Sequence, residues 1–195
     1  MKTKILGLLV VGLLVGPIAA SAATVFSDNF NASASGLNVA PTGWTVTDGT
    51  VDVVSGGFCV SGFCVDLDGS TSNAGVLSRS FSLVSGLEYL LSFDLSGNQR
   101  GGSDNVVVTF GTATLSFTGL AASAPYARYS LEFTPSSDGT FSISFANAGG
   151  DNVGALLDNV VVTSGDAVSE VPEPGTLALL GLGLAGLGLS RRRKA

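Results

Sequence analysis

Acidic side chains are the residues of this chain best able to carry chemistry. Between Thr24 and Val168, thirteen Asp and Glu residues accompany only three arginines, so this segment has a net charge of 3 − 13 = −10. Two carboxylates can hydrolyse a glycosidic bond when they flank it. The candidate acids for such a pair are Asp66, Asp68, Glu88, Asp94 and Glu132. No motif brings two of them together, and Asp94 and Glu132 alternate outward from expected strands, which favours a solvated face.

The same oxygens suit a hard cation. Calcium prefers carboxylates and backbone carbonyls, and "FSDNF" and "LLDNV" supply Asp28 and Asp158 in the first and last expected strands. If these strands are neighbours, the two acids are candidate ligands of one structural calcium ion. The alternative is that each Asp-Asn pair caps a strand or turn through side-chain-to-backbone bonds. No EF-hand spacing is present, and no other cofactor is expected.

The chain contains no histidine. This removes the commonest general base and the commonest zinc ligand. No serine lies in a nucleophile-elbow motif, so the sequence disfavours an acyl-transfer enzyme. The acidic segment repels phosphate backbones, so nucleic acid is not an expected partner, whereas cations and neutral glycans are compatible with it.

The two cysteines, Cys59 and Cys64, lie close together in "GGFCVSGFCVDL". A two-residue hairpin loop at Ser61 and Gly62 would place Cys59 opposite Cys64, with Cα atoms about 4.5 Å apart, within the range that a disulfide tolerates. Because an exported protein meets an oxidising environment, we expect a local disulfide. The spacing does not fit Cys-x-x-Cys, and soft ligands for zinc are too few.

A glycine-hinged loop, "LSGNQRGGSDN", concentrates planar hydrogen-bonding groups between two expected strands. Such groups bind sugar hydroxyls, and functional residues favour loops on rigid scaffolds. The candidate ligand residues are Asn98, Gln99, Arg100, Asp104 and Asn105. Arg100 has an alternative structural role as the partner of Asp104 or of another acid. The single Trp44 could stack on a sugar, but its apolar neighbours favour a place in the core.

Short alternating segments fill the chain from residue 24 to residue 164. "YLLSFDL", "YSLEF" and "FSISF" each place aromatic and aliphatic residues on one face and polar residues on the other, which is typical of half-buried antiparallel strands. About ten such strands with regular turn signals predict an all-β, antiparallel sandwich. The first and last strands both have the composition of pairing strands, which favours a jelly roll. Arg79 falls on the same face of its expected strand as apolar residues, so it must lie at a sheet edge or pair with a buried acid.

Both ends of the chain are typical of targeting segments. Residues 1–23 combine a basic start, an apolar run and "AASAA", the pattern of a signal peptide handled by the Sec translocon and signal peptidase. Residues 165–170 form an acidic linker. Residues 175–190 are uncharged and predict a short transmembrane helix. Four basic residues then act as a membrane stop, which keeps the C-terminus cytoplasmic: Arg191, Arg192, Arg193 and Lys194.

The C-terminal segment 171–195 closely resembles the PEP-CTERM sorting signal of Gram-negative bacteria. The resemblance rests on Pro172-Glu173-Pro174, the apolar helix and the terminal basic cluster. It implies processing by an exosortase, a membrane-embedded cysteine protease, with Val171, Pro172, Glu173 and Pro174 as the recognition and processing motif. It also implies export, transient retention at the inner membrane, and delivery to the cell surface or extracellular matrix. The domain 24–164 is similar in general style to jelly-roll carbohydrate-binding domains.

These observations predict a non-enzymatic surface or matrix protein whose β-sandwich binds exopolysaccharide. The alternative is a secreted glycoside hydrolase or lyase that uses an Asp/Glu pair. A structural spacer without any ligand is a third interpretation.

Overall fold

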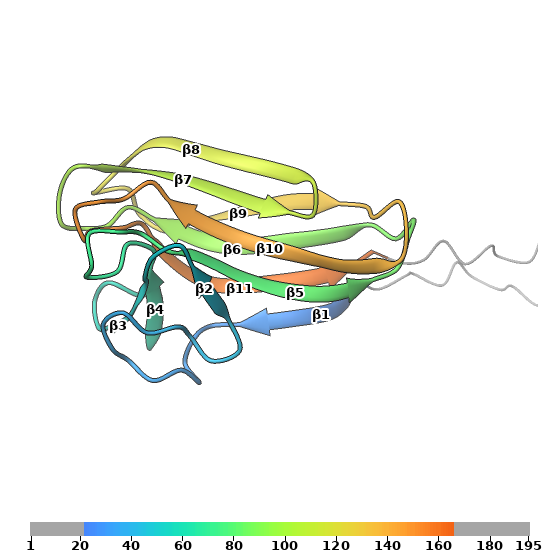
Figure 1. Cartoon of the computed structure of the whole chain (residues 1–195), viewed down its shortest axis with the longest axis horizontal. Helices are drawn as coiled ribbons and strands as arrows, with labels where there is room; N and C mark the ends of the chain where they lie inside the picture. The colour runs from blue at the N-terminus through green and yellow to red at the C-terminus, as the bar shows by residue number, and fades with distance from the viewer. Residues whose placement is uncertain (1–21, 166–195) are drawn as a thin grey trace, which may run out of the picture.

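The computed structural model describes residues 22–165, which form eleven strands in two antiparallel sheets (Figure 1). Sheet A consists of β1 (Ala23–Asp28), β3 (Asp52–Ser55), β4 (Phe63–Asp66), β6 (Tyr89–Ser96), β9 (Ala127–Phe133) and β11 (Leu156–Ser164). Sheet B consists of β2 (Thr45–Thr47), β5 (Val76–Leu83), β7 (Ser103–Phe110), β8 (Ala113–Ala121) and β10 (Gly139–Asn147). The predicted all-β jelly-roll sandwich is therefore confirmed.

The core lies between the sheets because the alternating strands turn one face toward it. In β6, Leu91, Phe93 and Leu95 are fully buried, and the ring of Phe93 packs at 5.2 Å, centroid to centroid, on Phe145 of β10. The predicted faces of β6, β9 and β10 are confirmed. Trp44 is also buried, and its Nε1–H donates to Asp28 at 2.8 Å, so the core assignment for this residue is correct.

The first and last strands pair, as the sequence predicts. In sheet A the strand order is β3-β4-β11-β6-β9, and β1 lies beside β11 beyond the end of β4. Ala23 is opposite Ser164, so both ends of the domain leave the sandwich at the same end (Figure 1). Leu156, at the start of β11, lies at the other end, opposite Asp66 of β4.

The predicted signal peptide, acidic linker, transmembrane helix and basic stop lie outside the described residues. Within residues 22–165, no helix is long and apolar enough to cross a membrane.

The predicted two-residue hairpin at Ser61 and Gly62 is wrong. The hairpin is formed by β3 and β4, with Ser55 opposite Phe63, so residues 56–62 make a seven-residue loop. Gly56 has φ 93°, a conformation that glycine adopts without strain, and the chain leaves β3 there. The Cys59–Cys64 disulfide is present, with a Cα–Cα distance of 5.3 Å, but it ties this loop to β4 rather than joining two strands.

Arg79 lies at an edge, one of the two places expected for it. Its guanidinium is beyond the end of β2, donates to the carbonyl of Gly43 at 2.7 Å, and lies 4.3 Å from the ring centroid of Phe26. The cation therefore covers an aromatic ring rather than pairing with an acid.

Candidate functional site

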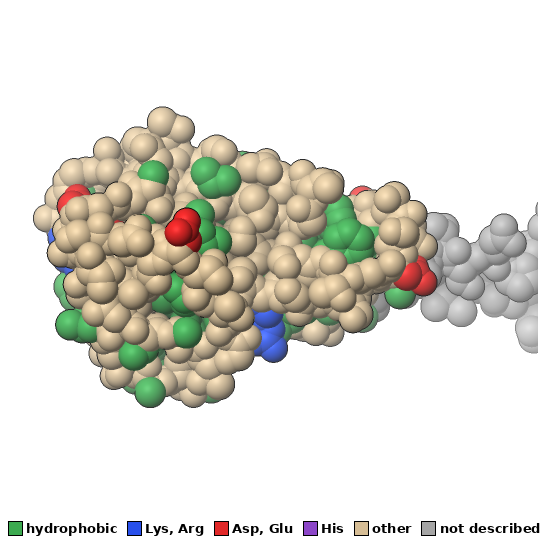
Figure 2. Space-filling view, in the orientation of Figure 1, with side chains coloured by type: hydrophobic (Ala, Val, Ile, Leu, Met, Phe, Trp, Pro, Cys, Tyr) green, Lys and Arg blue, Asp and Glu red, His purple; other side chains and the backbone are tan. Residues whose placement is uncertain are grey.

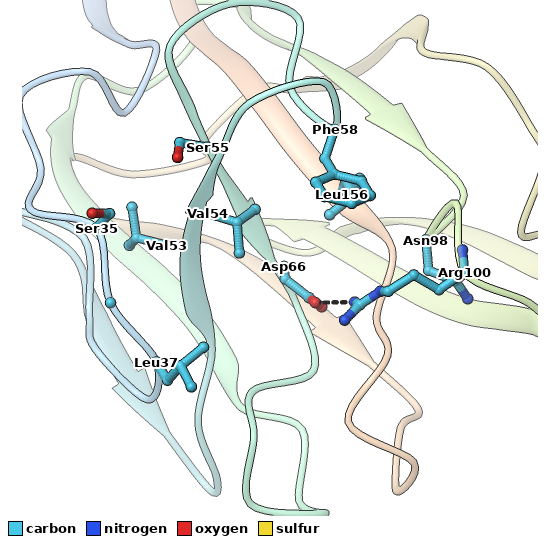
Figure 3. A pocket seen from close by; sticks show the side chains of 11 residues that line it. Ser35, Leu37, Val53, Val54, Ser55, Phe58, Asp66, Asn98, Arg100 and Leu156 are labelled. Atoms are coloured by element: carbon cyan, nitrogen blue, oxygen red, sulfur yellow. Dashed lines mark hydrogen bonds and ion pairs between the residues drawn. The ribbon is translucent and has the colours of Figure 1, made fainter.

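A pocket of about 320 Å³ opens at the end of the sandwich opposite the chain ends, and Figure 3 shows the side chains that line it. It lies between the β3–β4 hairpin, the loop after β6 and the start of β11. Its lining is mainly apolar, with one ion pair, and comprises Ser35, Gly36, Leu37, Val53, Val54, Ser55, Phe58, Asp66, Asn98, Arg100 and Leu156. Apolar walls with a few convergent polar groups are typical of small-molecule sites.

The ion pair joins Arg100 to Asp66, the last residue of β4 (Figure 3). The Asp66 side chain is only 1% exposed, whereas that of Arg100 is 39% exposed. The other carboxylate oxygen of Asp66 accepts hydrogen bonds from the amides of Asp68, at 3.1 Å, and Gly154, at 2.8 Å. Burial raises the pKa of Asp66 to about 6, although these bonds and the guanidinium act in the opposite direction.

A buried amide shapes the loop that presents Arg100. Asn98 is 1% exposed, and its Oδ1 accepts from the backbone amides of Arg100, at 2.7 Å, and Gly101, at 3.0 Å. Its Nδ2 donates to the Gly101 carbonyl and to Asp104, each at 2.9 Å. Burial raises the pKa of Asp104, with its hydrogen bonds from Asn98 and Asn147 opposing that shift. All the donors and acceptors of Asn98 are thus engaged in holding the loop.

Only part of the predicted ligand loop lines the pocket. Arg100 and Asn98 line the pocket, and Asp104 lies outside the lining and accepts a hydrogen bond from Asn98. Gln99 lies outside the lining, since its amide donates to the carbonyls of Gly97 and Ala124. Asn105 also lies outside it and accepts a hydrogen bond from the Gly119 amide at 2.8 Å. Arg100 pairs with Asp66. Of the two structural partners predicted for it, Asp104 or another acid, the second is therefore the one observed.

The apolar wall is the part of the pocket that sequence reasoning missed. Phe58 is 45% exposed and Leu37 is 65% exposed, and both lie in loops that line the pocket. The Phe58 loop is fixed by the adjacent disulfide and by Asp158, whose Oδ2 accepts from the Val60 amide at 3.2 Å. No periodic pattern marks either residue; the only signal was the position of Phe58 beside a disulfide cysteine.

The two candidate calcium ligands lie on paired strands but bind protein donors. Asp28 accepts from the Phe30 amide at 2.7 Å and from Trp44 Nε1, and Asp158 accepts from the amides of Asn159, at 2.7 Å, and Val60. Burial raises the pKa of Asp158. No group of three or more His, Cys, Asp or Glu residues in the described part of the chain is placed to hold a metal ion. The calcium site stays a prediction.

No two of the candidate catalytic acids line the pocket together. Asp94 makes a two-point ion pair with Arg128, at 2.7 and 2.9 Å, and this interaction lowers the pKa of Asp94. Asp68 is buried and accepts from the Gly150 amide at 2.9 Å. Asp66 is the one of the five candidates that lines the pocket.

Solved structures with a similar fold include xylan-related modules. The CBM22-1 xylan-binding domain of Paenibacillus barcinonensis Xyn10C superposes with a TM-score of 0.55 and 14% identity, over 77% of this chain and 100% of that chain. The tandem CBM22-1–CBM22-2 domain of the same protein superposes with a TM-score of 0.57 and 14% identity, over 81% of this chain and 49% of that chain. The CBM22-1–GH10 modules of Clostridium thermocellum xylanase 10B, complexed with xylohexaose, superpose with a TM-score of 0.51 and 16% identity, over 76% of this chain and 30% of that chain. At these identities the similarity concerns the fold alone.

Two family models match the chain. No curated protein matches it. The model described as PEP-CTERM protein-sorting motif matches residues 170–194, which confirms the resemblance of the C-terminal segment. The model described as protein of unknown function (DUF642) matches residues 23–163, which span β1 to all but the last residue of β11. The chain therefore carries a PEP-CTERM sorting signal and belongs to the DUF642 family.

Proposed function

We propose that this protein is a non-enzymatic component of the cell surface or extracellular matrix that binds exopolysaccharide through the Asp66–Arg100 pocket. The sorting motif implies exosortase-dependent export to the cell envelope. On this proposal the Sec translocon and signal peptidase act on residues 1–23, the helix and basic stop hold the protein briefly at the inner membrane, and exosortase processes it at Val171 to Pro174. The sandwich, residues 24–164, is the glycan-binding part, and residues 165–170 connect it to the tail.

The observation that carries this proposal is the combination of groups in the pocket. Sugar rings present apolar C–H faces and polar hydroxyl edges together. Phe58 and Leu37 offer exposed apolar surface, while Arg100 offers guanidinium N–H donors held in place by Asp66 (Figure 3). A planar guanidinium with fixed geometry suits bonds to adjacent oxygens. Because the pair is neutral overall, it suits uncharged glycans.

Binding is tested with the exported protein and exopolysaccharide purified from the producing cells, by affinity electrophoresis and calorimetry. Arg100→Gln is expected to weaken binding about tenfold to a hundredfold, the range for a hydrogen bond to a charged group. Phe58→Ala is expected to weaken it about tenfold through lost apolar contact. Arg128→Gln is the matched control, since it removes the other arginine–aspartate pair found in residues 22–165, at a place outside the pocket lining. Equal affinity of the wild type, R100Q and F58A would contradict the proposed site.

Sorting is tested separately by replacing Pro172, Glu173 and Pro174 with alanine. The expected result is an unprocessed protein of higher mass that stays in the membrane fraction. An unchanged mass and location would contradict exosortase processing at this motif.

The second candidate function is a glycoside hydrolase or lyase, and the raised pKa of Asp66, about 6, is the observation in its favour. A general acid is most efficient when its pKa lies near the working pH. Turnover of the polysaccharide that is abolished by Asp66→Asn would establish this candidate in place of simple binding.

A further inference from the structure

One edge of sheet B differs from every other strand edge in the described residues. An edge strand exposes unpaired backbone N–H and C=O groups and so can pair with another chain. Natural proteins limit this with short strands, charges, bulges or covering segments. The strands with a free edge in residues 22–165 are β1, β2, β3, β8 and β9, together with the half of β5 that β2 leaves unpaired.

Each of these edges other than β8 is short, carries a charge, is covered or is interrupted near its middle, whereas the register shift of β8 lies near its C-terminal end. In sheet B, β2 has three residues, and the free half of β5 contains Arg79. In sheet A, β3 has four residues and is covered by Gly36, which exchanges backbone hydrogen bonds with Val53. A register shift between Thr24 and Phe26 interrupts β1. Strand β9 contains the charged residues Arg128 and Glu132.

Strand β8 has nine residues, "ATLSFTGLA", without a charge or a proline. It pairs with β7 on one side only, and it forms the upper rim of the sandwich in Figure 1. The register with β7 is continuous from Ala113 to Phe117 and shifts only near Gly119, which has φ 66°. Leu115 and Phe117 pack against the core, and Thr114 and Ser116 are exposed on the outer face. The edge is therefore regular and anchored over five residues.

The surface beside this edge is uncharged, although the domain is strongly acidic. None of the outward positions of the sheet B strands carries a charge. A row of hydroxyl residues crosses the sheet in register, one on each strand: Thr45, Ser78, Ser144, Thr109 and Thr114. The face viewed in Figure 2 accordingly has few acidic or basic side chains. Two copies that meet at β8 would therefore bring no charged outward positions of sheet B together.

We propose that β8 is a self-association edge, at which the β8 strands of two copies pair antiparallel and join two five-stranded sheets into one ten-stranded sheet. Antiparallel pairing of a strand with its own copy follows a two-fold axis, so each copy offers the same residues to the other. We choose a second copy of this chain as the partner because the chain is acidic overall but carries no charge on β8 or at the outward positions of sheet B, so two identical domains can meet there with little repulsion. This proposal does not depend on glycan binding.

The test is sedimentation velocity and light scattering of the exported protein over a range of concentrations. The wild type is expected to form a dimer. Ser116→Lys places a positive charge on the edge of each copy, and like charges on paired strands repel, so the dimer dissociation constant is expected to rise at least tenfold. Ser142→Lys is the matched control: it adds the same charge to an exposed serine on the same face, but on the interior strand β10, and should leave dimerisation unchanged.

A second measurement separates pairing from folding. Amide hydrogen exchange of Ala113–Phe117 is expected to slow as protein concentration rises in the wild type and in S142K, but not in S116K. A wild type that is monomeric at all concentrations, or one whose dimer is weakened equally by both substitutions, would overturn the proposal. So would a dimer whose β8 amides show no concentration-dependent protection.

Discussion

The two ends of the sandwich use aspartate in opposite ways. At the pocket end, Asp66, Asp104 and Asp158 are buried, and burial raises the pKa of each. At the end where the chain enters and leaves, Asp138 is exposed, and the hydrogen bond from the Ser85 amide, at 2.7 Å, lowers its pKa. At the pocket end, burial destabilises the charged form of the aspartates, while their hydrogen bonds fix the geometry of the loops. At the other end, Asp138 caps a turn with little loss of stability. Buried polar groups that cost stability are typical of functional sites.

The largest difference between the ends is expected from Asn98→Ala. This change leaves the amides of Arg100 and Gly101 without their acceptor and Oδ2 of Asp104 without its donor, and it should lower the free energy of unfolding by about 3–4 kcal/mol. Urea unfolding of the variant and the wild type measures this. A loss below about 1 kcal/mol would show that the loop is not held by its amide.

The next effect is the pH dependence that Asp66 causes. The pKa of Asp66 rises from 3.8 to about 6 on folding, so protonation of this carboxyl stabilises the folded state. This stabilisation is fully present below pH 3.8 and is lost as pH rises through about 6. Relative to Asp66→Asn, the wild type should therefore lose up to about 3 kcal/mol of stability between pH 4 and pH 7. Unfolding curves at both pH values test this; parallel pH profiles for the two proteins would contradict it.

A smaller loss is expected when the disulfide is removed by Cys59→Ser together with Cys64→Ser. The bridge closes a short loop, which corresponds to about 2 kcal/mol of stability. Because the loop also carries Phe58, glycan affinity should fall with it. Stability measured by urea unfolding, with affinity measured alongside, checks both effects; a variant that keeps full affinity would show that Asp158 alone positions the loop.

The smallest effect is expected at the opposite end. Asp138→Asn should leave the melting midpoint at pH 7 nearly unchanged, because the carboxylate is exposed and solvent competes for its hydrogen bond. The lowered pKa means that its contribution is present above the unfolded pKa and lost as pH falls through the folded pKa. Calorimetry at pH 7 tests it, and a large drop in the midpoint would remove the contrast between the two ends.

The sequence predicted the sandwich well and the pocket poorly, for physical reasons. Alternation is local, so the buried faces of β6, β9 and β10 could be read directly, and the matching composition of the end strands predicted the β1–β11 pair. The Asp66–Arg100 pair joins residues 34 positions apart, and nothing in the spacing selects Asp66 over Asp104. The hairpin error arose because Gly56 and Gly62 both have positive φ, and the sequence offered two places for the chain to turn.

Strand β11 has a mechanical consequence. It begins at Leu156, which lines the pocket, and ends at Ser164, after which the chain continues toward the sorting signal, so eight residue steps, roughly 27 Å, separate the pocket from that end of the strand. Tension between a ligand in the pocket and the C-terminal segment would act lengthwise on β11, which is paired with β6 on one side and with β1 and β4 on the other. The backbone bonds would then be loaded together in shear rather than opened one after another, so the strand suits a domain that must resist pulling.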